Sequence, residues 1–183
     1  MNKLVRCTSL SALGFALLFA GFSTYMTLNL PFDQKVDCAT GEPGYGLLAP
    51  ACRAYINFFS TGATQGEREQ MSSNLHRLMT AYTLNSQTEI GENALNLADR
   101  FIERGADANF VDKDGATPLH TAVLHGDERL VRFLLSRGAD ADQSTHIQFL
   151  SATLSPLELA QTIKQKGNSE QKWGEIIRLL ENQ

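Results

Sequence analysis

The sequence predicts an all-α fold in which about three helix-turn-helix units stack into a solenoid. We expect this stack to follow an N-terminal hydrophobic helix and a loop-rich segment. Three observations lead to this prediction. Apolar residues recur at helical spacing in the second half of the 183-residue chain. One sequence pattern recurs at a fixed offset, and a stretch without charged residues lies near the N-terminus.

Residues 1–32 are predicted to be a signal peptide or a transmembrane anchor. Lys3 and Arg6 are the only charged residues before Asp33. The apolar run 13–22 has the length of a signal-peptide core, but the whole uncharged stretch is long enough to cross a bilayer as a helix. The positive-inside rule then places the rest of the chain across the membrane from the two basic residues.

Two fates of this N-terminal segment stay open at the level of sequence. An uncleaved segment would give a single-pass inner-membrane protein with its C-terminal domain in the periplasm. Cleavage near Ser23, which lies two residues after Gly21, would give a periplasmic or secreted protein.

Residues 33–64 are predicted to be a loop-rich segment that contains a disulfide. Glycines and prolines interrupt residues 40–50, and a short helix is expected over about 51–59. Cys38 and Cys52 both lie on the exported side. Two cysteines in an oxidising compartment favour a disulfide that closes a loop of about fifteen residues, with two free thiols as the alternative.

Residues 65–183 are predicted to form the helical domain. Five apolar residues follow one face of a first helix, namely Met71, Leu75, Leu78, Met79 and Tyr82. A second helix is expected over about 90–104, and Gly105 terminates it because glycine readily adopts a positive φ.

An internal repeat follows these two helices. The sequence Gly-Ala-Asp-Ala-Asn of residues 105–109 recurs 33 residues later as Gly-Ala-Asp-Ala-Asp at 138–142. A similar apolar helix precedes each copy. A period of 33 residues is typical of a helical repeat that buries its apolar faces only against its neighbours.

The stretch from Asp112 to Asp142 carries turn and cap residues in a fixed order. A glycine makes a tight turn, a threonine caps the next helix, a proline takes its first position, and glycines end both helices. These residues, with the leucine and histidine that follow the proline, are Gly115, Thr117, Pro118, Leu119, His120, Gly126 and Gly138. This stretch resembles an ankyrin repeat along nearly its whole length. The whole chain is similar to short bacterial-type exported or membrane-anchored ankyrin-repeat proteins.

The resemblance implies repeats over about 71–109, 110–142 and 143–183, of which the first and last are degenerate caps. The sequence Ser-Pro-Leu at 155–157 repeats the cap of the middle unit at an offset of 38. The connection between successive units, called the finger, is therefore about five residues longer than usual between Asp142 and Ser155. His120 is expected to have a structural role, because the family uses this histidine to bond backbone groups of neighbouring turns.

The resemblance also implies that the chain binds another protein through its fingers and first-helix surface. The positions that match variable contact sites of the family, together with the long finger, are Phe110, Lys113, Asp114, Ala116, Leu124, His125, His146 and Phe149. Phe149 and its neighbour Leu150 have a second interpretation, in which they fold back onto the last repeat.

Several function classes are excluded by what the sequence lacks. The net charge is −4 and no long basic run is present, so we expect no nucleic-acid partner. No nucleophile–base pair, metal-ligand spacing or phosphate-binding glycine loop was found, so we expect no enzyme activity, cofactor, metal or small-molecule substrate. The predicted function is to bind or inhibit another exported protein, for example as an immunity protein against a toxin. The alternative is a structural scaffold of an envelope membrane complex.

Overall fold

The first repeat is built from two long helices whose ends follow from the sequence. α4 spans Gln65–Leu84 and α5 spans Glu89–Glu103 in this computed structural model. The Thr64 hydroxyl caps α4 by accepting a hydrogen bond from the backbone N–H of Glu67 at 3.2 Å. All five predicted apolar residues of α4 are buried, which confirms the amphipathic pattern.

The second repeat has shorter helices with well-defined caps. α6 spans Pro118–His125 and α7 spans Glu128–Ser136. Gly126 ends α6 with a φ of 60°, and the Asp127 carboxylate then accepts a hydrogen bond from the Leu130 N–H at 2.9 Å to start α7. The predicted turn and cap residues therefore have the positions that the ankyrin pattern implied.

The third repeat consists of α8, Pro156–Lys166, and α9, Glu170–Glu181. A capping box starts α8. The Ser155 N–H donates to the Glu158 carboxylate at 2.8 Å, and the Glu158 N–H donates to the Ser155 hydroxyl at 3.2 Å. Trp173 and Ile176 of α9 are buried. This repeat therefore closes the core at its C-terminal end.

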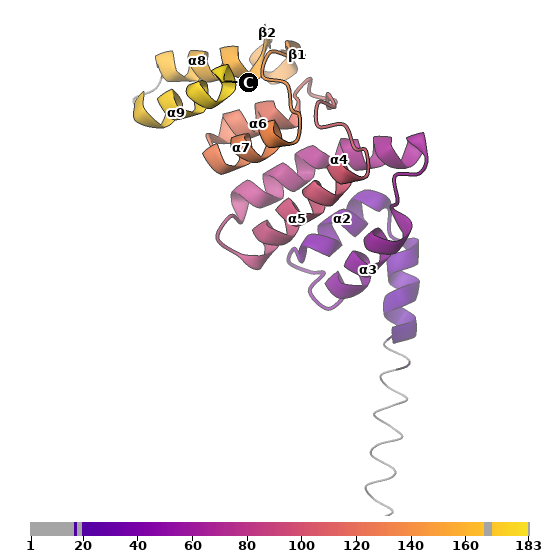
Figure 1. The fold of residues 1–183 in the computed structure, drawn as a ribbon. Helices are drawn as coiled ribbons and strands as arrows, with labels where there is room; N and C mark the ends of the chain where they lie inside the picture. Colours follow the sequence, from indigo (N-terminus) through magenta and orange to yellow (C-terminus); the bar gives the residue numbers. More distant parts are fainter. Residues whose placement is uncertain (1–16, 18–19, 167–169, 183) are drawn as a thin grey trace, which may run out of the picture. The chain divides into compact units, whose positions relative to one another are not determined.

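The three helix pairs follow one another in a stack, α4–α5, α6–α7 and α8–α9 (Figure 1). α6 packs between α4 and α8, while α7 packs on α9. The buried residues Leu119, Ala122 and Leu134 of the middle repeat join its neighbours in one core. The middle repeat thus buries both of its sides, as a solenoid requires.

A short hairpin between the second and third repeats adds two strands to the otherwise helical stack. Strands β1, Thr145–Ile147, and β2, Ala152–Leu154, pair antiparallel with His146 opposite Thr153. The 3₁₀ turn η1, Gln148–Leu150, connects them. The extra residues of the long finger form this hairpin because a lengthened connection can pair its own backbone groups.

The chain divides into two compact units, residues 1–60 and 61–183. In the first unit residues 20–29 are helical and are followed by α2, Phe32–Thr40, and α3, Ala49–Phe59. The short helix predicted over about 51–59 is confirmed by α3, whereas the prediction of a loop before residue 40 was wrong, because α2 occupies that stretch. Apolar Val36, Ala39 and Ile56 give α2 and α3 a shared buried side, and the turns are confined mainly to the connection between them.

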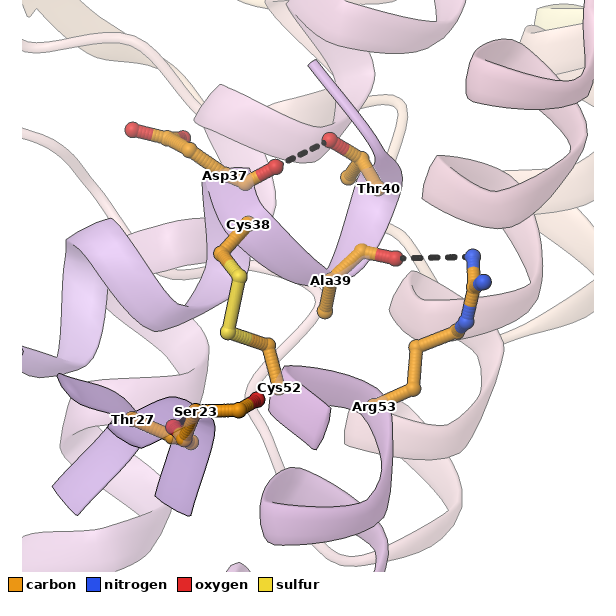
Figure 2. Close-up of a disulfide and its surroundings, with 8 residues drawn as sticks. All are labelled: Ser23, Thr27, Asp37, Cys38, Ala39, Thr40, Cys52 and Arg53. Atoms are coloured by element: carbon orange, nitrogen blue, oxygen red, sulfur yellow. Dashed lines mark hydrogen bonds between the residues drawn. A yellow bond between two sulfur atoms is a disulfide. The ribbon is translucent and has the colours of Figure 1, made fainter. Parts of the chain in front are cut away.

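The predicted disulfide joins these two helices. Cys38 of α2 and Cys52 of α3 have Cα atoms 5.9 Å apart, and both are fully buried (Figure 2). The Arg53 guanidinium donates to the Ala39 carbonyl at 3.3 Å and adds a second link between the helices. The bridge adds to the stability that the small shared core of α2 and α3 provides.

The structure describes Leu17, residues 20–166 and residues 170–182. Most of the predicted signal or anchor segment, including Lys3, Arg6 and Cys7, lies outside the described residues. No helix within the described part of the chain combines the length and the apolarity that crossing a membrane requires.

We predict that breaking the disulfide destabilises the first unit selectively. Replacing Cys38 and Cys52 by Ser is expected to lower its free energy of unfolding by about 3 kcal/mol, because the bridge restricts the unfolded chain over a loop of this length. Hydrogen exchange would show faster exchange in α2 and α3 and unchanged exchange in α6 and α7. A Cys7→Ser variant serves as the control. Unchanged exchange in α2 and α3 would contradict the prediction.

Candidate protein-binding site

His120 fixes the start of α6 and the finger of the next repeat at the same time. Its Nδ1 accepts a hydrogen bond from the Thr117 backbone N–H at 3.1 Å, so Nε2 carries the proton. Nε2 then donates to the Leu154 carbonyl of β2 at 3.0 Å. The side chain is fully buried, and burial lowers its pKa. The family-based expectation of a structural role for His120 agrees with this geometry.

His76 of α4 makes a second link of the same kind, which the sequence analysis missed. Its Nε2 lies 3.3 Å from the Phe110 carbonyl, and its Nδ1 lies 3.2 Å from the Thr121 hydroxyl of α6. Burial lowers its pKa, while the nearby Asp112 carboxylate and the Phe110 carbonyl act in the opposite direction. The sequence feature that could have indicated this role is the position of His76, next to Leu75 on the apolar side of a predicted helix.

The hairpin is held on the preceding finger by backbone atoms. The Gln148 N–H donates to the Asp114 carbonyl at 3.0 Å, and the Gln148 side-chain amide donates to the Lys113 carbonyl at 2.9 Å. Gly115 lies so close that a Cβ there would be 1.9 Å from the His146 carbonyl oxygen. Ser151 closes the hairpin tip with a φ of 50°. These contacts hold the hairpin in a defined position beside α6 and α8.

An apolar pocket of about 380 Å³ lies between the hairpin and helices α6 and α8. The end of α6, the second half of the hairpin and one side of α8 line it, with Leu124, Leu150, Ala152, Leu154, Leu159, Thr162, Ile163 and Lys166. The volume lies in the range of sites that bind small molecules or one or two apolar side chains of a partner. Lys166 is the one charged residue among those that line it, and no ion pair links it to another described residue.

The predicted contact residues differ in their exposure to solvent. Lys113, Asp114, Leu124, His125, His146 and Phe149 are exposed. Phe110 is half-buried, and its carbonyl is used by His76. The prediction was wrong for Ala116, which is 3% exposed. Its N–H donates to the Asp112 carboxylate and its carbonyl accepts from the Asp112 N–H, so this alanine belongs to the turn.

Of the eight predicted contact residues, only Leu124 lines the pocket. Leu150, for which two interpretations stayed open, lines it as well and is still 39% exposed. Phe149 is 59% exposed at the tip of the hairpin and does not fold into the last repeat. Leu154, Ile163 and Lys166 were not predicted, because only the folded hairpin brings them opposite Leu124.

Comparison with known proteins agrees with this architecture. A family profile described as ankyrin repeats in three copies matches residues 78–170. The chain belongs to the ankyrin-repeat family. The ankyrin repeat and LEM domain-containing protein 1 homolog of Caenorhabditis elegans is 29% identical over 113 residues, which cover 60% of this chain. The chain spans 15% of the length of that relative.

Ankyrin repeats are in general non-catalytic modules that bind other proteins. Within the described ranges, no three His, Cys, Asp or Glu side chains converge in an arrangement that could hold a metal ion.

We predict that the stability of the repeat stack falls as the pH drops below about 6.5, the usual pKa of histidine. In this range His76 and His120 are protonated in the unfolded chain but stay neutral in the folded chain, because folding lowers their pKa. The free energy of unfolding therefore keeps falling until the pH passes the lowered pKa of the folded state. Urea unfolding between about pH 8 and pH 5 measures this dependence.

The matched variants for this test are His76→Gln with His120→Gln and, as the control, His125→Gln. The double variant is expected to be less stable at high pH, because it loses buried hydrogen bonds, and to show a smaller slope of stability against pH. His125 is exposed on α6, so its replacement leaves the buried hydrogen bonds of His76 and His120 in place. An equal slope in all three proteins would contradict the prediction.

A second prediction concerns the contact between Gly115 and the hairpin. Gly115 and Gly138 have φ values of 82° and 84°, but a Cβ at Gly138 meets nothing within 4 Å. Gly138→Ala is expected to cost about 1–2 kcal/mol from backbone strain alone. Gly115→Ala is expected to cost about 1–3 kcal/mol more, because it also forces the hairpin away. Equal losses in denaturant unfolding would show that the hairpin does not depend on this close approach.

Proposed function

We propose that this protein binds another exported protein on the outer side of a membrane, and that its ankyrin stack supplies the binding site. The observation that carries the proposal is the open apolar pocket between the hairpin and helices α6 and α8. An apolar surface of this kind stabilises a complex when a partner side chain fills it. Exposed Phe149 beside the pocket adds an aromatic anchor of the type that is enriched at interfaces.

The exported location is supported by the disulfide of the first unit. Cys38 and Cys52 are joined and buried, and such bridges persist in oxidising compartments. The predicted N-terminal anchor, with Lys3 and Arg6 on the cytoplasmic side, would hold the chain at the inner membrane with both units in the periplasm. The disulfide and the charge pattern are independent observations that favour the same compartment.

The partner is proposed to be a single protein that is held or inhibited by the contact, as in the neutralisation of a toxin. The pocket has room for one or two apolar side chains, and only the end of α6, the hairpin and one side of α8 line it. A surface of this size fits one dedicated partner better than the several partners of a scaffold.

We predict that a photo-crosslinking amino acid at position 163 or 124 captures one protein in cells. The side chains of Ile163 and Leu124 line the pocket, so a bound partner lies within reach of both. The control position is Ser136, which is exposed on α7 and does not line the pocket. Mass spectrometry of the adducts identifies the captured protein.

The captured protein is then tested with Leu124→Asp and Ile163→Asp. Each variant is expected to weaken its binding by about ten-fold or more, because a carboxylate loses its hydration in an apolar contact. If the partner is a toxin, these variants also release its activity. Adducts at position 136 but not at 124 or 163 would overturn the proposed site.

A further inference from the structure

The helix of residues 20–29 in the first unit carries its side chains in an inverted arrangement. Ser23 and Thr27 are 8% and 3% exposed, whereas Phe22, Tyr25 and Leu28 are 57%, 65% and 56% exposed. A helix that packs on a protein core in water normally buries its apolar side and exposes its polar side. This helix instead buries two small polar residues and exposes three large apolar ones beside exposed Thr24 and Asn29, so its outward side is mainly apolar.

The buried side of the helix faces the disulfide. Ser23 and Thr27 lie in the surroundings of the Cys38–Cys52 bridge (Figure 2). Small side chains allow a close approach to the two cysteines. The helix is therefore a part of the folded unit, and its orientation, with the three large residues outward, is fixed by packing.

Polar side chains on this helix are satisfied within the helix itself. The hydroxyls of Thr24 and Thr27 donate to the carbonyls of Ala20 and Ser23, both at 2.8 Å. The Asn29 amide donates to the Tyr25 carbonyl at 2.7 Å. Internal hydrogen bonds of this kind are required where water is absent, and residues 20–31 also contain no charged side chain.

A lysine fixes the C-terminal end of the helix. The Lys35 ammonium donates to the Leu28 carbonyl at 3.3 Å and lies 4.0 Å from the centroid of the Tyr55 ring. A cation favours the C-terminal end of a helix, and the aromatic ring of α3 stabilises it further. The end of the helix is thus tied to both α2 and α3.

We infer that the outward face formed by Phe22, Tyr25 and Leu28 contacts the lipid of the membrane. A helix whose apolar face is buried in the boundary between headgroups and acyl chains gains the hydrophobic free energy that this face lacks in water. Tyrosine is enriched at this depth. The inference rests on the proposed membrane tether, and it is independent of what the ankyrin pocket binds.

The same arrangement implies that the N-terminal segment is retained. Cleavage near Ser23 would remove or free the turn of helix that lies against the disulfide, and would leave Thr27 without its hydrogen-bond acceptor. The intact protein is therefore expected to keep the segment that precedes Phe22. Of the two fates that the sequence left open, the packing of Ser23 favours the uncleaved anchor.

The test places single tryptophans in the full chain and measures contact with lipid. Trp173→Phe removes the one native tryptophan, and Phe22→Trp or Tyr25→Trp then reports on the outward face. The protein is reconstituted into phosphatidylcholine vesicles with or without bromine atoms on the acyl chains. Bromine is expected to lower the emission of both variants by about half, since the residues lie near the acyl chains.

The control is Ser136→Trp in the same Trp173→Phe background, because Ser136 is exposed on α7 of the ankyrin stack. Its emission is expected to be insensitive to bromine. Equal quenching at positions 22, 25 and 136 would indicate general adsorption and would overturn the inference. Absence of quenching at 22 and 25 would also overturn it and would assign the face to a second copy or another protein.

An intact-mass measurement separates this inference from the proposed function. Loss of the residues before Ser23 in the protein purified from cells would overturn both the tether and the lipid face. Retention of the segment without quenching would overturn only the lipid face. Neither result affects the crosslinking test of the ankyrin pocket.

Discussion

Stability of the ankyrin stack depends on the requirement that each helix pair be covered by a neighbouring pair. Leu119, Ala122 and Leu134 of the middle repeat are fully buried only because α4 and α8 lie on its two sides. His76 and His120 add hydrogen bonds to this burial of apolar side chains. His76 joins α4 to the finger before α6, and His120 joins α6 to the finger before α8. The fingers are therefore positioned by the same contacts that complete the core.

The capping boxes of the middle and last repeats use different residues at the third helical position. In the middle repeat the third helical position is His120, whose second nitrogen reaches the next finger. In the last repeat the corresponding residue is Glu158, whose carboxylate accepts from the Ser155 N–H. The glutamate satisfies the start of its own helix, and α9 then closes the core with Trp173. A stack of this length gains stability from such caps because its terminal repeats have one neighbour each.

Local features of the fold could be predicted from the sequence, and features that depend on distant contacts could not. The Gly105 and Gly138 repeat, the Thr117 cap and the disulfide each depend on residue types at fixed spacing. The pocket depends on how the hairpin folds over α8, so Leu154, Ile163 and Lys166 carried no signal of their own. Ala116 occupies a position that varies in the family, but the turn around Asp112 buries it in this chain.

The way the hairpin is held has a consequence for how this protein can change during evolution. Its attachment uses the backbone of Lys113, Asp114 and Leu154 and the side chains of His120 and Gln148. Phe149 at the tip takes no part in that attachment and is 59% exposed, whereas Leu150 lines the pocket. Substitutions at Phe149 alter the surface beside the pocket at little cost to folding. Recognition of a new partner can therefore be acquired at the tip while the scaffold stays unchanged.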